Sequence, residues 1–282
     1  MKYAMYSRFN SFLNQYGAEI TADYMESLGL SYAETLEATP LPTAIPTVEY
    51  AKELKSAFGA RGISFACASA FANILVPGTI DGLYKKVEIA AALGSPFFHH
   101  TFIPHIVMQE GLPSIDEGIE MSVEAAVKVA RFARTLGVTC IYEEQGLYIN
   151  GLENFGRFFY EVKRVCDDVG VIGDSGNSLF VGVEPDVFFK TYAKDVKHVH
   201  IKDYLRVKSD TRPGETWLPT ESGKSGTWVR DAIVGDGVVD FEKCIAALKE
   251  VGYDGVYSFE LTHPEPFGDG VKKAEQIIER YI

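Results

Sequence analysis

Strand-like and helix-like segments alternate along the whole chain, and this alternation limits the possible folds more than any other feature. Short apolar runs typical of buried strands each precede a segment with helical spacing or helix-ending residues. The expected strands cover residues 3–7, 32–37, 63–68, 96–100, 138–142, 171–173, 196–203 and 255–259, and the expected helices cover 18–28, 47–59, 81–93, 114–136, 152–167, 185–194, 241–252 and 269–282. Eight such units in 282 residues favour an α/β fold, a single (β/α)8 TIM barrel, over a doubly wound sheet.

One segment, residues 204–237, interrupts the alternation. It is rich in Gly, Ser and Thr and lacks hydrophobic periodicity, so we expect a long loop after the seventh strand. Trp217 and Trp228 lie in it, and they either roof a pocket or form a subunit contact of a homo-oligomer, which the sequence leaves open. Because no linker or change of composition divides the chain, we expect one domain spanning residues 1–282.

The charge and apolar content of the chain exclude several classes of partner. A net charge of −12 argues against nucleic acid and anionic membranes, since both need a basic face on the protein. The N-terminus lacks an apolar signal region, and no segment reaches the ~18 apolar residues of a membrane span, so a cytoplasmic protein is expected. The dispersed cysteines are expected to be reduced core thiols: Cys67, Cys140, Cys166 and Cys244.

The seventh expected strand carries more polar residues than a core strand needs. In it His198, His200 and Lys202 alternate with apolar residues and so share one face. In a barrel of parallel strands the active site lies at the carboxyl ends of the strands. Strands five to eight each end with one polar candidate there, namely Glu143, Asp174, His200 and Glu260.

These four side chains predict a metal site. Three carboxylates on one rim repel one another unless a cation lies between them, and oxygen ligands with one imidazole suit Mn²⁺, Co²⁺ or Mg²⁺, with Zn²⁺ also compatible. Glu143 and the adjacent Glu144 must point to opposite sides, and we select Glu143 because it stands at the rim. We select His200 over His198 because it lies nearer the end of the strand, which leaves His198 as a buried structural residue.

The segments GVTCIYEEQG, GVIGDSGN, VKHVHIKDY and VGDGVVDF with GYDGVYSFEL resemble the sugar-phosphate isomerase/epimerase group of the xylose isomerase-like TIM barrels. The similarity covers residues 135–262 by motif. In the first half of the chain it consists only of the alternation of strand-like and helix-like segments. It implies that the four residues above bind one divalent metal. It also implies that Glu143 and Glu260 act as acid and base, one on each face of the substrate carbon.

The resemblance extends to substrate contacts. Arg206 lies six residues after His200, where such enzymes often carry an arginine. Asn177, three residues after Asp174, stands where ketose epimerases tend to have a substrate-binding histidine, and this departure leaves the sugar and the epimerase assignment open. Further candidate contacts, each of which could instead be ordinary strand-end, loop or surface polarity, are Lys202, His105 and Glu34.

The expected chemistry is proton transfer next to a carbonyl. A metal that chelates a carbonyl and a neighbouring hydroxyl stabilises the enediolate formed when the carbon between them loses its proton. We therefore expect a metal-dependent sugar isomerase or epimerase with a small carbohydrate substrate. Loss of a β-hydroxyl would instead make the site a dehydratase of a keto-polyol such as an inosose or dehydroshikimate. A non-catalytic sugar-binding protein ranks below both, as does an apurinic endonuclease, since the chain has only six histidines.

Overall fold

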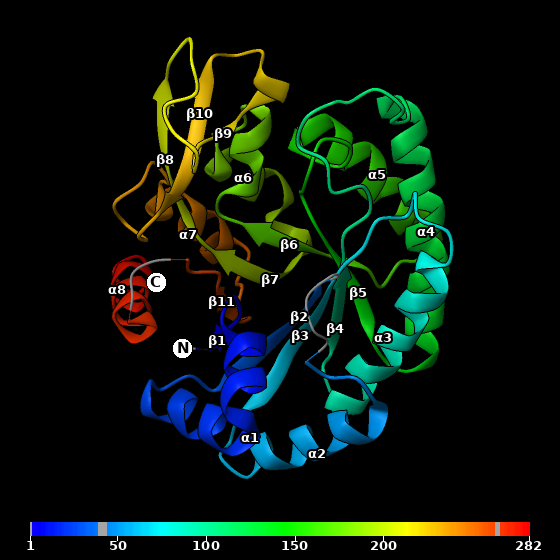
Figure 1. Ribbon diagram of the computed structural model, residues 1–282, viewed down its shortest axis with the longest axis vertical. Helices are drawn as coiled ribbons and strands as arrows, with labels where there is room; N and C mark the ends of the chain where they lie inside the picture. Colours follow the sequence, from blue (N-terminus) through cyan, green and yellow to red (C-terminus); the bar gives the residue numbers. More distant parts are fainter. Residues whose placement is uncertain (1, 39–43, 263–265) are drawn as a thin grey trace.

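The computed structural model describes residues 2–38, 44–262 and 266–282, and a closed barrel of parallel strands forms its centre (Figure 1). The barrel strands are β1 (Tyr3–Met5), β2 (Tyr32–Ala38), β3 (Ser64–Phe71), β4 (Phe97–His100), β5 (Thr139–Glu143), β6 (Gly170–Asp174), β7 (Val196–Ile201) and β11 (Tyr257–Phe259). Around the barrel their order is β1-β11-β7-β6-β5-β4-β3-β2, and β2 pairs with β1 to close it. The expected TIM barrel is confirmed.

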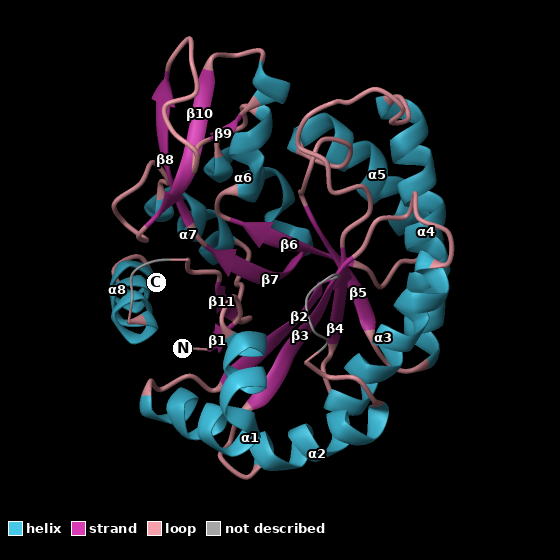
Figure 2. Ribbon diagram, viewed as in Figure 1, coloured by secondary structure: helices cyan, strands magenta, loops and turns pink. Residues whose placement is uncertain are grey.

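Helices surround the strands on all sides in the view of Figure 2. They are α1 (Phe9–Ser27), α2 (Val48–Gly59), α3 (Thr79–Leu93), α4 (Ile115–Thr135), α5 (Gly151–Val165), α6 (Pro185–Tyr192), α7 (Phe241–Glu250) and α8 (Phe267–Glu279). Short 3₁₀ helices η1 (Asn177–Val181), η2 (Ala193–Asp195) and η3 (Glu221–Gly223) complete the connections. Each helix covers the outside of the barrel with its apolar side, and aromatic residues such as Phe155, Phe158 and Phe188 fill the space between α5, α6 and the strands.

Capping side chains explain where several helices begin. Thr47 accepts a hydrogen bond from the backbone N–H of Tyr50 at the start of α2, and Asp240 does the same with Lys243 at the start of α7. Gly94 ends α3 with φ 74°, a left-handed conformation that favours glycine. These helix ends confirm the boundaries expected from the sequence.

The first helix begins earlier than expected. It runs from Phe9, but Gly17 interrupts it with φ 76° and ψ 175°, so the expected helix over 18–28 corresponds to its second part. Residues before Gly17 are helical because Phe9 and Leu13 bury their side chains against the barrel. A helix of two turns has too short an apolar pattern to be recognised without that packing.

The excursion after the seventh barrel strand is present, but the expectation that it lacks regular structure is wrong. It forms an antiparallel sheet of β8 (Asp203–Lys208), β10 (Thr227–Ala232) and β9 (Leu218–Pro219), in the order β8-β10-β9. Figure 1 shows this sheet projecting beyond the barrel near α6. Its buried face packs Tyr204 and Val229 against Leu179 and Phe180 of η1, contacts between distant segments that no local pattern reveals.

One buried carboxylate ties the two ends of this excursion together. Asp203 accepts hydrogen bonds from the backbone N–H groups of Tyr204, Gly235, Gly237 and Val239. A side chain at Gly237 would meet Asp203 Oδ1 at 2.0 Å, so glycine is required for this close approach. The sheet is therefore anchored directly beside the end of β7.

All four cysteines are buried and unpaired, as expected for reduced core thiols. Within the described ranges 2–38, 44–262 and 266–282, no helix combines the length and apolar character needed to cross a membrane.

We predict opposite effects of alanine at two helical glycines. At Gly118 in α4 a new Cβ would lie 2.1 Å from the ring of Tyr148, whose hydroxyl donates to Pro113 O at 2.9 Å, so the ring cannot easily move. Gly118→Ala should lower the free energy of unfolding by about 1–3 kcal/mol. Gly82→Ala in α3, where a Cβ meets nothing within 4 Å, should raise it by about 0.5–1 kcal/mol. Urea unfolding measures both, and equal effects would contradict the packing at Gly118.

Candidate functional site

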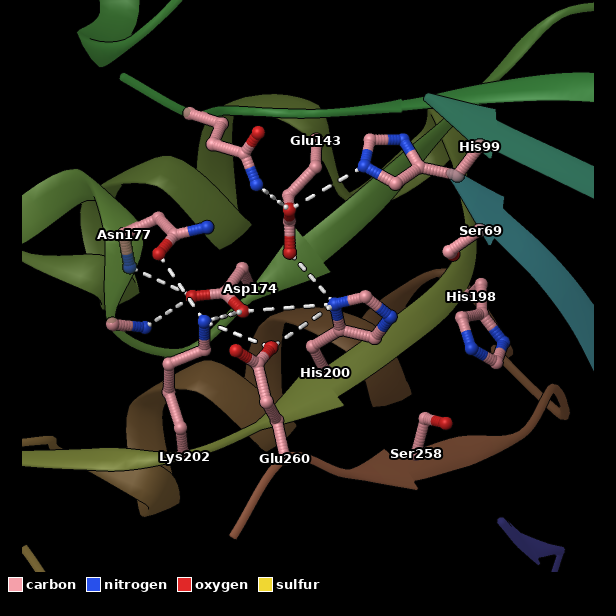
Figure 3. Close-up of polar contacts among 12 residues, drawn as sticks. Ser69, His99, Glu143, Asp174, Asn177, His198, His200, Lys202, Ser258 and Glu260 are labelled. Atoms are coloured by element: carbon pink, nitrogen blue, oxygen red, sulfur yellow. Dashed lines mark hydrogen bonds and ion pairs between the residues drawn. The ribbon is translucent and has the colours of Figure 1, made fainter. Parts of the chain in front are cut away.

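Four polar side chains from four adjacent barrel strands converge at the carboxyl end of the barrel (Figure 3). Glu143 ends β5, Asp174 ends β6, and His200 lies one residue before the end of β7. Glu260 follows β11 directly. Each residue offers one ligand atom, and these atoms all lie within 4.8 Å of one another. The strand register pairs His200 of β7 with Asp174 of β6, so these two residues lie at the same height in the barrel. On its other side His200 pairs with Ser258 of β11, two residues before Glu260. We call these four residues the rim cluster.

The imidazole of His200 faces all three carboxylates through one nitrogen. Its Nδ1 lies 2.7 Å from Glu143 Oε1, 3.6 Å from Glu260 Oε2 and 3.8 Å from Asp174 Oδ2. The ring is held in this direction by Tyr6, which stacks on it with ring centroids 4.7 Å apart. His200 Nδ1 therefore occupies the centre of the rim cluster.

Backbone N–H groups orient the carboxylate of Asp174. Its Oδ1 accepts hydrogen bonds from Gly176 N at 2.8 Å and Asn177 N at 2.7 Å, in the turn that leads into η1. Its Oδ2 is buried and accepts no hydrogen bond of good geometry from the protein. The turn thus satisfies one oxygen and directs the other into the rim cluster.

A buried lysine lies among the acidic groups. Lys202 Nζ is 2.9 Å from Glu260 Oε2, 3.1 Å from Asp174 Oδ2 and 3.2 Å from Asn177 Oδ1. Burial opposes its charge, but Asp174 and Glu260 raise the pKa of the ammonium well above its ordinary value. Burial likewise opposes a charge on His200, whereas Glu34 and Glu143 raise the pKa of its imidazole well above normal. Two cationic groups therefore face three carboxylates.

The residues of the rim cluster fit a divalent metal ion. Three carboxylates and one imidazole are a donor set that Mn²⁺, Mg²⁺, Co²⁺ and Zn²⁺ accept. The buried Oδ2 of Asp174 lies 3.1 Å from the Lys202 ammonium but accepts no well-aligned hydrogen bond from the described residues, which suits a metal ligand. Glu260, whose side chain is 31% exposed, opens the cluster to the outside.

The structure places the other candidate residues differently from one another. Lys202 and Asn177 lie beside the rim cluster and contact each other. Among the described residues, the buried Asn177 Nδ2 has no hydrogen-bond acceptor. Arg206 lies on β8 and forms an ion pair with Glu184, the residue before α6. His105 lies in the loop after β4, and within the described part of the chain no hydrogen bond or ion pair links its side chain to the rim cluster.

Glu34 is deeper than a rim residue. It is fully buried in the barrel, hydrogen-bonded to His198 and His200.

Of the adjacent residues Glu143 and Glu144, Glu143 belongs to the rim cluster. Glu144 is fully buried outside the cluster, and burial raises the pKa of its carboxyl well above normal.

Two polar residues beside Glu143 were missed in the sequence. Gln145 Nε2 donates to Glu143 Oε2 at 2.8 Å, and His99 Nε2 lies 3.6 Å from the same oxygen. His99 is the last residue but one of β4 in the run FFHH, as His200 is of β7, so the strand-end rule applied to strand four would have pointed to the pair His99 and His100. Gln145 follows the strand in a bridge with Ile149, which only the folded loop shows.

Comparison with known proteins adds a family and several similar structures. The family model described as xylose isomerase-like TIM barrel matches residues 22–281. An inosose dehydratase of Bacillus thuringiensis (strain Al Hakam) is 27% identical over 150 residues, which cover 49% of this chain and 49% of that protein. The matches to inosose dehydratases span 29–49% of the length of those proteins, that is, half or less.

Two solved structures resemble the whole chain. The IOLI protein, crystallised with a zinc atom, has a TM-score of 0.73 at 19% identity, covering 100% of this chain and 99% of that one. The D-allulose 3-epimerase from Methylomonas sp. has a TM-score of 0.71 at 16% identity, covering 100% and 98%. At these identities the likeness concerns the fold.

We predict that Lys202 stabilises the folded protein. Lys202→Met leaves two neighbouring carboxylates without their cation, and breaking such a buried pair typically costs about 3–5 kcal/mol. Lys128→Met, which removes an exposed lysine paired with Glu124, is the matched control and should change little. Chemical unfolding in the presence of a chelator measures both variants. Equal stability of the two would show that Lys202 does not compensate the carboxylates.

Proposed function

The chain belongs to the xylose isomerase-like TIM barrel family, and we propose that it is a metal-dependent isomerase or epimerase of a sugar or sugar derivative. The observation that supports this most is the convergence of Glu143, Asp174, His200 and Glu260, one from each of four adjacent strands. These residues would hold one divalent metal. When bound, such an ion polarises a carbonyl and stabilises the negative charge that develops when the neighbouring carbon loses a proton.

Glu143 and Glu260 are proposed to transfer the proton. They come from β5 and β11, which β6 and β7 separate in the barrel, so the two carboxylates approach the centre of the rim cluster from different sides. One removes a proton from a substrate carbon and the other returns a proton, on the opposite face in an epimerase. Gln145 and His99 adjoin Glu143 Oε2 and would hold that carboxylate in position.

Lys202 and Asn177 are proposed to bind the substrate. Lys202 supplies a buried ammonium beside Glu260, and Asn177 Nδ2 is a buried donor without an acceptor in the part of the chain that the structure describes. Both suit hydroxyl or carbonyl oxygens of a polyol. Arg206 contacts the substrate only if it leaves Glu184, and His105 would need its loop to approach the rim.

A dehydratase is the second candidate, favoured by the inosose dehydratases among the relatives. Removal of a proton beside a carbonyl is common to both reactions. Elimination additionally needs a donor that protonates the departing hydroxyl, and the Lys202 ammonium, 2.9 Å from Glu260, is proposed as that donor.

We predict that the protein binds one divalent ion and that Glu143 is a ligand. Elemental analysis after chelator-free purification should find about one ion per chain, with Mn²⁺, Co²⁺, Mg²⁺ and Zn²⁺ tested separately by calorimetry. Glu143→Gln should weaken binding by more than the roughly 10–100-fold expected for loss of an outer partner. The adjacent Glu144→Gln is equally buried and should bind normally. Absence of metal from the native protein, with no uptake of any of the four ions, would favour a non-catalytic sugar-binding protein.

We predict deuterium exchange next to a substrate carbonyl. Metal-loaded protein in D₂O, incubated with a panel of ketoses and keto-polyols, should incorporate deuterium at that carbon, as NMR detects. Appearance of an epimer or an aldose identifies an isomerase, and loss of water identifies the dehydratase. At saturating metal, Glu260→Gln should lower the exchange rate by about 10²–10⁴-fold. An unchanged rate in this variant would remove Glu260 from the proton transfer.

A further inference from the structure

A second group of polar side chains lies deeper in the barrel, below the rim cluster. It consists of Glu34 on β2, Ser69 on β3, His198 and His200 on β7, and Ser258 on β11, all of them almost completely buried. Figure 3 shows Ser69, His198 and Ser258 on the side of the His200 ring that faces away from the three carboxylates of the rim cluster. His200 is the one residue that both groups share.

Glu34 is the acceptor at the centre of this deeper group. Its Oε1 accepts hydrogen bonds from Ser69 Oγ at 2.8 Å and His200 Nε2 at 3.1 Å. Its Oε2 accepts from His198 Nε2 at 2.7 Å and from Ser258 Oγ. A buried carboxylate is stable only with such partners, and here four donors from three strands surround it.

These contacts determine which nitrogen of His200 keeps its proton when an ion binds. A carboxylate accepts hydrogen bonds and cannot donate, so Nε2, which faces Glu34, must bear hydrogen. By the same argument Nδ1, 2.7 Å from Glu143 Oε1, bears hydrogen while no ion is bound. A divalent ion would replace the Nδ1 proton, and because Glu34 holds the other proton on Nε2, the lone pair would then lie on Nδ1, which faces Glu143, Asp174 and Glu260. Contacts on opposite edges of the ring thus orient it for coordination through Nδ1.

Glu34, His198 and His200 could also be considered as a metal site, because their ligand atoms lie within 4.8 Å of one another. The hydrogen bonds of Glu34 argue against it. Its two oxygens already accept from His198 Nε2 at 2.7 Å and from His200 Nε2 at 3.1 Å. The two serine hydroxyls, moreover, already donate to the carboxylate.

We propose that Glu34 is a positioning residue that holds His200 as the Nε2–H tautomer and thereby presents Nδ1 to the metal ion. The proposal rests on the metal-dependent function proposed above. It differs from a substrate contact, since both oxygens of Glu34 are engaged inside the barrel. The stacked ring of Tyr6 supports the same orientation of His200 by limiting its rotation. Carboxylate partners of this kind typically contribute 10–100-fold to metal affinity.

Glu34→Gln tests the proposal because it keeps the size of the side chain. One carboxylate oxygen becomes an NH₂ group, which cannot accept a hydrogen bond from a histidine N–H. The two donors then face each other unless His200 or His198 changes its tautomer. Glu37→Gln is the matched control. Glu37 lies on the same strand, is buried and accepts hydrogen bonds from Asn10 and Ile45, and among the described residues it has no hydrogen bond or ion pair with a histidine.

Calorimetry with Zn²⁺ and with Mn²⁺ measures the effect. Glu34→Gln should bind about 10–100-fold more weakly than the wild type, and Glu37→Gln should bind like the wild type. Circular dichroism verifies that the variants are folded. A folded Glu34→Gln protein with wild-type affinity overturns the proposal. If Glu34→Gln and Glu37→Gln weaken binding equally, the effect is general loss of stability and the proposal is likewise overturned.

NMR of the ring nitrogens of the Zn²⁺-loaded wild type tests the tautomer without any variant at Glu34. A proton on Nε2 of His200, identified by its loss in His200→Asn, supports the proposal, and a proton on Nδ1 overturns it. Failure of the proposed function appears differently. Wild-type protein that binds no divalent ion overturns both proposals, whereas normal metal binding by the wild type with no effect of Glu34→Gln overturns only the role of Glu34.

Discussion

Repulsion among three carboxylates at the mouth of the barrel is the constraint on which the rest of the site depends. Glu143 and Asp174 are almost fully buried, and at low dielectric their negative charges are costly unless cations lie beside them. His200 and Lys202, two residues apart on and just after β7, supply that compensation within the protein. A divalent ion would add to it. The acidic groups come from separate strands, so the closed barrel both creates the repulsion and brings the compensating groups to it.

His200 connects two layers of the barrel interior. Toward the rim its Nδ1 faces the carboxylates, and toward the base its Nε2 faces Glu34. In the deeper layer both oxygens of Glu34 accept hydrogen bonds, so the buried carboxylate supports the strands, although His198 Nδ1 is buried without a partner among the described residues. The same strands therefore carry the stability of the barrel and the geometry of its rim, and a change in the deeper layer reaches the rim through one imidazole ring.

Much of the fold was predictable because its signals are local. Thr47 and Asp240 mark helix starts because their side chains accept hydrogen bonds from nearby backbone N–H groups, and Gly94 marks a helix end through its left-handed backbone. The structure contains all three of these expected helix ends. The sheet of β8, β9 and β10 was not predictable, since the β8–β10 register pairs residues 19 to 29 positions apart and its buried face depends on η1. Glu34 shows the same limit at the site. Its sequence position suggested a rim residue, but its partners lie up to 224 positions away.

The sequence by itself determined the barrel and the set of acidic and histidine residues at its strand ends, because alternation and strand-end polarity repeat in every unit. Only the tertiary structure decided which side chains those residues contact. It placed Lys202 between Asp174 and Glu260, paired Arg206 with Glu184, and engaged both oxygens of Glu34 below the rim. The physical reason is that these choices depend on the register and closure of distant strands, which set distances of a few ångströms that no spacing along the chain encodes.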